Sequence, residues 1–212
     1  MKKIYYCGFY GDPSPMSNRE IIPAADTKMS YIIESMRQTG FDVEVLSFCE
    51  DEDRTVFFEK RLGYVIERNG TKVVFFDHYT SKYRMLRVIG RWLSWQKIKR
   101  YLQKNCINDE SKIMIYHSLG LLNLVRLLEK KKKAFILEME EIYADVTEKK
   151  QTRVRELAVA GKASGYIFPT QLLSEIANPS QKPEVIIHGT YKVEPDRKCN
   201  IFAQNLHDDS ER

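Results

Sequence analysis

The sequence predicts an α/β fold, a Rossmann-like, doubly wound and mostly parallel sheet with an inserted β-hairpin at about residues 64–76. Three observations predict it. Strand and helix patterns alternate along most of the chain. The segments "KIMIY", "AFIL" and "EVII" are continuous apolar runs, typical of strands covered by helices on both faces. The length of 212 residues and the hydrophobic content of 43% suffice for one sizeable core.

The chain opens with the pattern of a βαβ unit. Strands are predicted at Lys3–Phe9 and Asp42–Phe48, with a helix at Pro23–Gln38 between them. Pro23 suits a first helical turn, and Gly40 suits a C-cap. Apolar residues spaced three and four apart form one stripe along this helix: Ala25, Met29, Ile32 and Met36.

A hairpin then interrupts the alternation. Residues 50–61 are interpreted as a surface connection. The dipeptide Asn69-Gly70 is a strong hairpin signal because both turn positions need positive φ. It separates two predicted strands, Tyr64–Arg68 and Thr71–Phe76.

The second half of the chain returns to alternating elements after a long helix predicted at Ser81–Lys104. Strands are predicted at Lys112–Tyr116, Ala134–Glu138, Gly165–Phe168 and Glu184–Ile187. Helices are predicted at Leu119–Lys130, Lys150–Lys162 and Gln171–Ala177. Residues 1–195 therefore form one Rossmann-like domain, and residues 196–212 are a polar linker or tail.

Composition limits the possible partners and cofactors. The net charge is +5 and acids are interspersed with bases, so no nucleic-acid partner is expected. Four cysteines lie far apart without a C-x-x-C pair, which argues for reduced thiols and against a metal site: Cys7, Cys49, Cys106 and Cys199. The apolar run at the N-terminus is too short for a signal peptide, and no run is long enough for a membrane span.

The loop "CGFYGDPSPMSNR" follows the first strand, where a dinucleotide fold would carry G-x-G-x-x-G. Only Gly8 and Gly11 are present, followed by Asp12, and no P-loop occurs anywhere, so no nucleotide cofactor is expected. Two interpretations remain open: a shaped rim for a polar substrate, or an ordinary surface connection.

Titratable side chains follow the carboxyl ends of several predicted strands, where open parallel sheets bind their ligands. His117 could act as a base or hydrogen-bond donor, or could be a structural histidine at a strand end. Glu138 and Glu140 should share one side of their strand, with Glu141 opposite. These carboxylates could accept bonds from sugar hydroxyls, or simply carry charge at a helix N-terminus. His188 directly follows the last predicted strand and takes the same kind of position.

The predicted helix at Ser81–Lys104 carries eight bases and no acid. Arg84, Arg87 and Arg91 share one helical face, and apolar residues share another: Met85, Ile89, Trp92 and Leu93. One interpretation is a helix that lies on an anionic bilayer or contacts phosphate groups. The other is a core-packing helix with a solvated basic face.

Taken in order, six segments resemble the N-terminal, acceptor-side domain of a GT-B fold glycosyltransferase, of the family 4 kind. They are "GFYGDPSP", "PAADTKMSYIIESM", "YHSLG", "LEMEEIY", "GYIFPTQLL" and "VIIHGTY". The resemblance covers about residues 1–195. His188-Gly189-Thr190-Tyr191 stands where the family more usually has Asn-Gly-Val-Asp.

This resemblance implies metal-independent transfer of a hexose from a nucleotide-sugar donor to a glycan or lipid-linked acceptor, in capsule or other surface polysaccharide biosynthesis. The donor would bind a second, C-terminal domain that this chain lacks, so the chain alone should be inactive. Its location would be cytoplasmic, with peripheral contact to the inner face of the membrane as an option. No cofactor is implied.

The resemblance also implies roles for individual residues. His117 would be catalytic, and Arg84, Arg87 and Arg91 would contact a membrane or phosphate. The acceptor would be bound by a further set: Gly8, Gly11, Asp12, Glu140, Glu141, His188 and Gly189. Two other functions remain open beside this one, a stand-alone small α/β enzyme and a non-catalytic module that binds a membrane or a partner.

Overall fold

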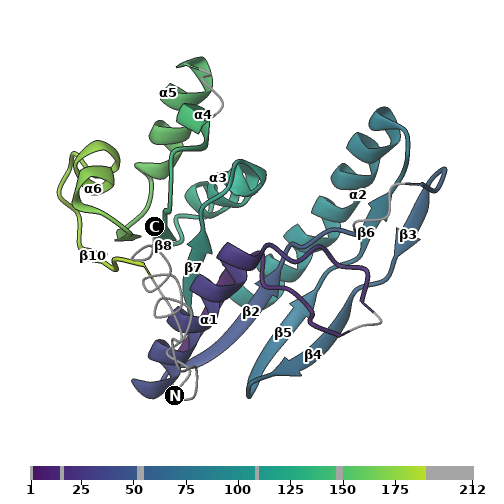
Figure 1. Cartoon of the computed structure of the whole chain (residues 1–212), viewed down its shortest axis with the longest axis horizontal. Coiled ribbons are helices and arrows are strands. Elements are labelled where there is room, and N and C mark those ends of the chain that lie inside the picture. The colour runs from purple at the N-terminus through teal and green to yellow at the C-terminus, as the bar shows by residue number, and fades with distance from the viewer. Residues whose placement is uncertain (1, 15–16, 52–54, 108–109, 147–149, 190–212) are drawn as a thin grey trace, which may run out of the picture.

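An eight-stranded sheet forms the centre of the computed structural model, which describes residues 2–14, 17–51, 55–107, 110–146 and 150–189. The strand order is β10-β9-β8-β7-β1-β2-β5-β4 (Figure 1). All neighbours pair in parallel except β4, which is antiparallel to β5. The strands are β1 (Lys3–Gly8), β2 (Asp42–Ser47), β4 (Tyr64–Arg68), β5 (Thr71–Phe75), β7 (Lys112–Tyr116), β8 (Ile136–Glu138), β9 (Gly165–Phe168) and β10 (Glu184–Ile186). The predicted fold class is confirmed; the predicted tail at 196–212 lies outside the described residues.

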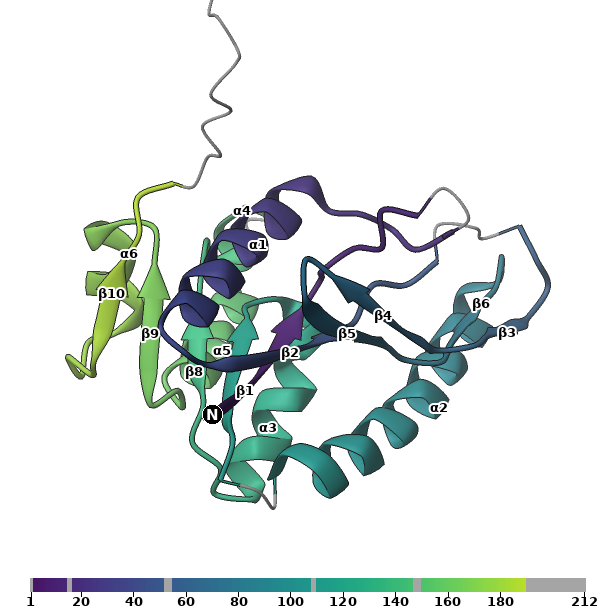
Figure 2. The same cartoon turned by 90° about the horizontal axis from the view of Figure 1, so that it is seen from below.

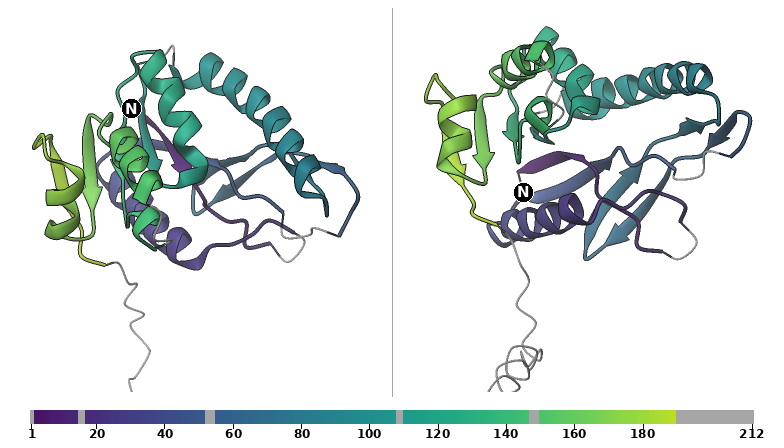
Figure 3. Two further views of the ribbon diagram at one scale, coloured as in Figure 1. Left: turned by 90° about the horizontal axis from the view of Figure 1, so that it is seen from above. Right: turned by 45° about the horizontal axis from the view of Figure 1, so that its top comes forward.

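Helices cover both faces of the sheet. α1 lies on one face, and α2 and α3 lie on the other (Figure 3). The helices are α1 (Pro23–Gln38), α2 (Arg84–Leu102), α3 (Leu122–Lys130), α4 (Tyr143–Val146), α5 (Lys150–Ala160) and α6 (Gln171–Ala177). A π-turn at Gln103–Ile107 continues α2, and a 3-10 turn at Leu119–Leu121 precedes α3.

The two helical layers enclose two hydrophobic cores separated by the sheet. Successive residues of β1 point to opposite faces, so Tyr6 packs on the α1 side with Met29, and Cys7 packs on the other side with Leu124. All four side chains are fully buried. The continuous apolar runs in the sequence therefore reflect strands that are buried on both faces.

The predicted hairpin extends the sheet at one edge (Figure 2). Asn69 and Gly70 both have positive φ, 51° and 69°, as the turn requires. β5 pairs in parallel with β2, and β4 forms the outer strand. This arrangement brings the carboxyl end of β5 beside those of β2 and β1.

Three short elements differ from the sequence prediction. β3 (Glu59–Arg61) and β6 (His78–Thr80) form a separate two-stranded antiparallel sheet, and α4 has four residues. The interpretation of residues 50–61 as a surface connection is therefore wrong for the β3 segment. Three or four residues are too few to show a helical or strand period, which explains the difference.

Small residues allow α2 to pack closely against the rest of the molecule. Gly90 and Ser94 are buried, and a Cβ added at Gly90 would lie 2.5 Å from the Cβ of Tyr79. The larger apolar residues of the first three turns consequently face outward, with exposed fractions of 80% for Met85, 62% for Val88, 50% for Ile89 and 60% for Trp92. The interpretation of the whole segment as a core-packing helix is wrong for this half; only the second half reaches the core, through Ile98 and Leu102.

The three described cysteines are buried: Cys7, Cys49 and Cys106. Burial raises the pKa of the Cys7 thiol, and it raises that of Cys49 to about 11. Among the described residues, no group of three His, Cys, Asp or Glu side chains is placed to hold a metal ion. No helix in the described ranges is long and apolar enough to cross a membrane.

Candidate functional site

A cleft of about 400 Å³ lies at the carboxyl ends of β1, β2, β5 and β7. The strand order reverses direction between β1 and β7, which is where open α/β sheets bind ligands. Phe9 follows β1 and Ser118 follows β7, and both line the cleft. Residues after β2 and β5 and the inner face of α2 complete its walls. We call this hollow the edge cleft.

The floor of the edge cleft is aromatic and apolar. Phe48 and Phe76 pack with ring centroids 5.6 Å apart, and both are half-buried. Trp95 and Ile98 contribute from α2. Such a surface can pack against the apolar face of a ring-shaped ligand while polar groups on the rim fix its orientation.

Arg19 holds the rim together from the opening loop. Its side chain is buried, and Nη1 donates to the carbonyl of Cys49 at 2.7 Å. Nη2 donates to the carbonyls of Leu62 at 3.2 Å and Phe76 at 3.0 Å. Burial lowers the pKa of Arg19 against the opposing effect of nearby Tyr64. Because this one guanidinium ties the chain after β2 to the chain after β5, it sets the shape of the cleft.

His78 is a second buried polar side chain at the same place. Its Nε2 accepts the backbone N–H of Asp51 at 3.0 Å. Burial, reinforced by the charge of Arg19, lowers the pKa of His78 to about 4, so the ring is neutral near pH 7. The proton therefore resides on Nδ1, which has no hydrogen-bond partner among the described residues.

The three arginines predicted to share one basic face do not form one free surface. Arg91 lines the edge cleft, and its guanidinium pairs with both oxygens of Glu50 at 3.1 and 3.0 Å. Arg87 donates to the carbonyls of Ser81 and Lys82, which precede α2. Arg84 is exposed. Their contact with a membrane or a phosphate stays a prediction.

The opening loop has a structural explanation for each of its glycines. A Cβ at Gly8 would meet the Sδ of Met29 at 2.7 Å, and a Cβ at Gly11 would meet the side chain of Ile21 at 2.8 Å. The Gly11 N–H also donates to Oδ1 of Asp26 at 2.8 Å. Both glycines therefore let the loop pack against α1 and the chain before it, and their contact with an acceptor stays a prediction.

Asp12 lines a smaller hollow of about 240 Å³ that shares Arg19 and His78 with the edge cleft. The residue is buried. Its Oδ2 accepts the hydroxyl of Tyr64 at 2.7 Å, and its Oδ1 accepts the N–H of Ser14 at 3.0 Å. Asp12 thus stands beside the cleft with its carboxylate already engaged.

His117 lies at the carboxyl end of β7, directly before Ser118 of the edge cleft. Its Nε2 contacts Oε1 of Glu156 at 2.6 Å, with both side chains almost fully buried. Glu156 also accepts the backbone N–H groups of Tyr143 and Ala144, each at 2.9 Å. Burial opposes ionisation of Glu156, but the bond from His117 and these amide bonds outweigh it and lower the pKa. Glu156 lies on α5 with no motif around it, so the sequence did not reveal this partner.

The glutamates at the carboxyl end of β8 form a second polar group, and none of them lines the edge cleft. Glu138 is fully buried, and neither carboxyl oxygen has a hydrogen-bond partner among the described residues. Burial raises its pKa, and the charge of Glu140 adds to the effect. Glu140 lies 3.4 Å from Nζ of Lys28, which donates to the carbonyl of Ile187 at 3.1 Å. Glu141 is exposed.

The segment after β10 approaches the segment after β9. Nδ1 of His188 donates to the carbonyl of Pro169 at 2.9 Å, and Gly189 has a φ of +60° with open space around its Cα. Lys28 connects this end with Glu140, so four predicted acceptor residues lie along the β8 to β10 end of the edge: Glu140, Glu141, His188 and Gly189. The structure thus separates them from Arg91 in the edge cleft and from Asp12 beside it.

Comparison with known proteins finds solved structures with a similar fold. No protein-family model matches the sequence, and no curated protein matches it. Among solved structures, UGT2 from Phytolacca americana, complexed with UDP-2fluoro-glucose and pterostilbene, aligns with a TM-score of 0.53 at 9% identity. The alignment covers 92% of this chain and 56% of UGT2. A UDP-forming α,α-trehalose-phosphate synthase from Burkholderia xenovorans aligns with a TM-score of 0.50 at 10% identity, over 92% of this chain and 44% of the synthase.

These likenesses concern the fold, since identities near 10% leave substrates and residues undefined. The chain spans about half the length of the structures it matches. Both are glycosyltransferases of the GT-B fold, so the expected GT-B domain is supported by its fold. The likeness is not specific to family 4.

Proposed function

We propose that this chain is the acceptor-binding domain of a glycosyltransferase that moves a sugar from a nucleotide-sugar donor to a glycan or lipid-linked acceptor in surface polysaccharide biosynthesis. The observation that carries the proposal is the edge cleft, which combines an aromatic floor with charged groups at its rim. A sugar ring presents apolar C–H faces and a belt of hydroxyls, which such a surface complements. The GT-B type of fold supports the reaction class.

In this proposal a second domain binds the donor. The first strand of this chain carries no glycine-rich phosphate loop, and no cofactor, metal or nucleic acid is required. The chain by itself should therefore bind acceptor without turning it over. A UDP-sugar is the first donor to test, because UGT2 was solved with UDP-2fluoro-glucose.

His117 is the proposed catalytic side chain, and Glu156 is the proposed positioning residue that fixes its ring. The imidazole would hydrogen-bond the reacting sugar or accept a proton from the attacking hydroxyl. Gly8, Gly11 and Asp12 would contact the acceptor from the opening loop. Further acceptor contacts are proposed from the other end of the edge: Glu140, Glu141, His188 and Gly189.

Acceptor binding by the 212-residue chain tests the proposal. A glycan array followed by calorimetry should identify an oligosaccharide that binds, and Trp95→Leu should weaken that binding about tenfold because it removes the largest ring of the aromatic floor. Tyr31→Leu removes an exposed aromatic ring from α1, away from the cleft, and should leave affinity unchanged.

Transfer of a radiolabelled sugar should appear only when a donor-binding domain is supplied, either in a longer natural chain or as a separate protein. Turnover of a small metabolite by the 212-residue chain alone would replace the proposal with the stand-alone enzyme. Failure to bind any glycan, with membrane or protein binding intact, would replace it with the non-catalytic module.

We further propose a cytoplasmic location with peripheral contact to an anionic inner membrane surface. The exposed apolar residues of α2 carry this part: Met85, Val88, Ile89 and Trp92. Arg84 and Lys82 flank them, and both are exposed, so the charge of this face complements anionic headgroups. The apolar side chains would enter the interface while the basic groups contact phosphates.

Co-sedimentation with vesicles of phosphatidylglycerol and phosphatidylcholine tests this location. The double variant Met85→Ser/Val88→Ser should lose most vesicle binding. A matched control, Val154→Ser/Leu172→Ser, removes two equally exposed apolar side chains from α5 and α6 and should bind like the unmodified chain. Equal binding by all three proteins, or none by any, would exclude the membrane contact through α2.

A further inference from the structure

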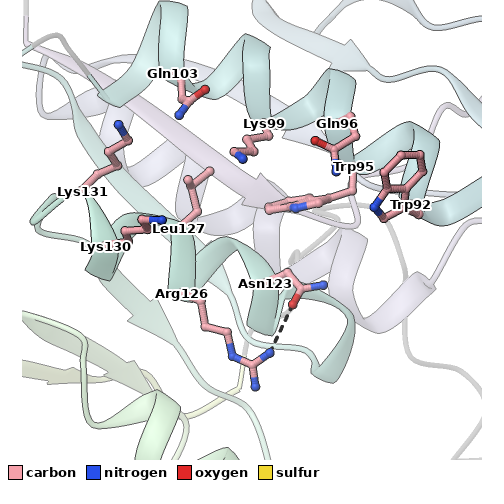
Figure 4. Close-up of a pocket in the computed structure, with 10 residues that line it drawn as sticks. All are labelled: Trp92, Trp95, Gln96, Lys99, Gln103, Asn123, Arg126, Leu127, Lys130 and Lys131. Atoms are coloured by element: carbon pink, nitrogen blue, oxygen red, sulfur yellow. Dashed lines mark hydrogen bonds between the residues drawn. The ribbon is translucent and has the colours of Figure 1, made fainter.

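A second hollow, of about 480 Å³, lies between α2 and α3. We call it the α2–α3 groove. The residues that matter to its chemistry are two aromatic rings and four cations: Trp92, Trp95, Lys99, Arg126, Lys130 and Lys131. Figure 4 shows Trp95 and Lys99 extending from α2 toward α3, while the guanidinium of Arg126 turns away from α2. Among the residues that the structure describes, no acidic side chain lines the groove.

The cations of the groove have no acidic partner within the described residues. None of Lys99, Arg126, Lys130 and Lys131 forms a salt bridge there, and Arg126 contacts only the amide oxygen of Asn123, at 3.3 Å. The three lysines gather around one end of the groove (Figure 4). That end therefore carries three ammonium charges that no described acidic side chain pairs with.

Two other cations of α2 do form salt bridges with acidic side chains. Arg91 pairs with Glu50, and Lys97 lies 2.6 Å from Asp77. Both acids come from loops at the carboxyl edge of the sheet. The two cations near that edge are thus neutralised, whereas the cations directed into the groove form no salt bridge among the described residues.

Helix dipoles explain only part of this arrangement. Lys130 and Lys131 lie at the C-terminal end of α3, where a cation is favoured. Lys99 is different, because the helix continues through the π-turn at Gln103–Ile107, about two turns beyond it. The partial charge at the end of α3, about half a negative charge, is also small against three ammonium groups.

The groove is also lined by amide and aromatic side chains. These suit an anionic ligand that carries a polar or a flat portion beside its charge. Gln103 lies among the three lysines and offers amide N–H donors (Figure 4). Trp92 and Trp95 form the other end. Asn123 and Trp95 also line the edge cleft, so the two hollows adjoin.

We propose that the α2–α3 groove is a binding site for a phosphomonoester or diphosphate group, held by Lys99, Lys130 and Lys131. The inference stands independently of the proposed function, since its three lysines are not among the residues assigned to acceptor binding or catalysis. A phosphate group carries up to two negative charges and accepts several hydrogen bonds, which matches a cluster of ammonium and amide donors. The group could belong to a free phosphorylated compound or to a lipid headgroup.

Tryptophan fluorescence gives a direct test, because the chain has two tryptophans and both line the groove. Inorganic pyrophosphate is titrated into the full chain at constant ionic strength, and short-chain phosphatidic acid is titrated in a second arm. We expect a saturable change in emission in at least one arm. Saturation by pyrophosphate identifies the soluble source, and saturation by the lipid alone identifies the headgroup.

The variant Lys99→Gln/Lys130→Gln/Lys131→Gln should weaken binding at least tenfold. Its matched control is Arg100→Gln/Lys104→Gln/Lys132→Gln, which removes three exposed charges from the same helix ends but outside the groove. The control should shift affinity less than threefold. Circular dichroism verifies that both variants fold, and calorimetry repeats the titration without relying on the tryptophans.

Two results would overturn the proposal. One is the absence of saturable binding in both arms, by fluorescence and by calorimetry. The other is an equal loss of affinity in the groove variant and the matched control, which would mean that the whole basic surface attracts anions without a site. Glycan binding at the edge cleft is measured separately, so its failure leaves this outcome unaffected.

Discussion

Two tyrosines, one fully buried and one partly buried, show how strongly the surroundings of one hydroxyl decide its contribution to stability. Tyr6 is fully buried, and its hydroxyl has no hydrogen-bond partner among the described residues. Tyr101 instead donates to Oε1 of Glu44 at 2.8 Å. An unpaired buried hydroxyl costs free energy, whereas a bond to a carboxylate contributes it.

We therefore predict opposite effects for the same substitution. Tyr6→Phe should leave the free energy of unfolding unchanged or raise it by about 1 kcal/mol, and Tyr101→Phe should lower it by about 1–2 kcal/mol. Urea unfolding followed by circular dichroism measures both. A loss of more than about 1 kcal/mol in Tyr6→Phe would mean that its hydroxyl has a partner in solution.

His78 should make the fold sensitive to mild acid. Its pKa is about 4 in the folded chain, below the ordinary 6.5, so the unfolded chain takes up this proton more readily. Stability should fall as pH decreases from about 6.5 toward 4, by up to about 3 kcal/mol in total, at about 1.4 kcal/mol per pH unit. Arg19, Arg61, Glu50 and Asp51 are the charged groups that act on this histidine.

Urea midpoints measured from pH 7 to pH 5 test this pH dependence. His78→Gln can still accept the Asp51 N–H but cannot titrate, so its midpoint should change less over the same range. The carboxylates with lowered pKa, such as Glu44 and Glu156, lose their stabilising charge only in more acidic solution. Identical slopes in the two proteins would refute the assignment to His78.

At the scale of the element, α2 depends on a close contact at Gly90. An added Cβ would lie 2.5 Å from the Cβ of Tyr79. We expect Gly90→Ala to lower the free energy of unfolding by about 1–2 kcal/mol, because overpacking outweighs the gain in helix propensity of about 1 kcal/mol. Gly120→Ala is the control, since its nearest contact is an ordinary 3.6 Å, and it should change stability by less than about 0.5 kcal/mol. A stabilised Gly90→Ala variant would show that α2 is free to move outward.

Five elements could be predicted from the sequence to the residue. The bounds of α1, β4, β7, β9 and α6 agree with those predicted. In α1 the apolar stripe, Pro23 at its start and Gly40 after its end all indicate the same helix. The packing face of α2 was harder to predict. Small residues form the inward face of its first half, and large apolar residues face solvent there, which is the reverse of the usual pattern.

Fewer residues of the candidate site could be predicted from the sequence. The carboxyl edge itself follows from the parallel strands, but Arg19, His78 and Trp95 come from segments far apart in the chain. They meet because β5 pairs with β2, a long-range choice that no local pattern encodes. The pair of His117 with Glu156 likewise joins residues 39 positions apart.

At the scale of the whole molecule, one sheet separates two cores that should unfold together. Met29 is fully buried on the α1 side and Leu124 on the α3 side. Each substitution to Ala should cost about 2–5 kcal/mol, and the double variant should show the sum because the sites are on opposite faces. Tryptophan emission from α2 and circular dichroism of the whole fold should give one coincident transition. Separate midpoints would indicate two layers that unfold independently.

The reaction rates of the buried cysteines can report how often the folded chain opens. A thiol reagent attacks the thiolate, and burial both raises the pKa of Cys7 and Cys49 and blocks access to them. Cys7 faces the layer of α2 and α3, and Cys49 belongs to the layer of α1. Each thiol can therefore react only while its own layer is open. The two alkylation rates, followed peptide by peptide in a mass spectrometer, would report how often each side of the sheet opens during the life of the folded chain.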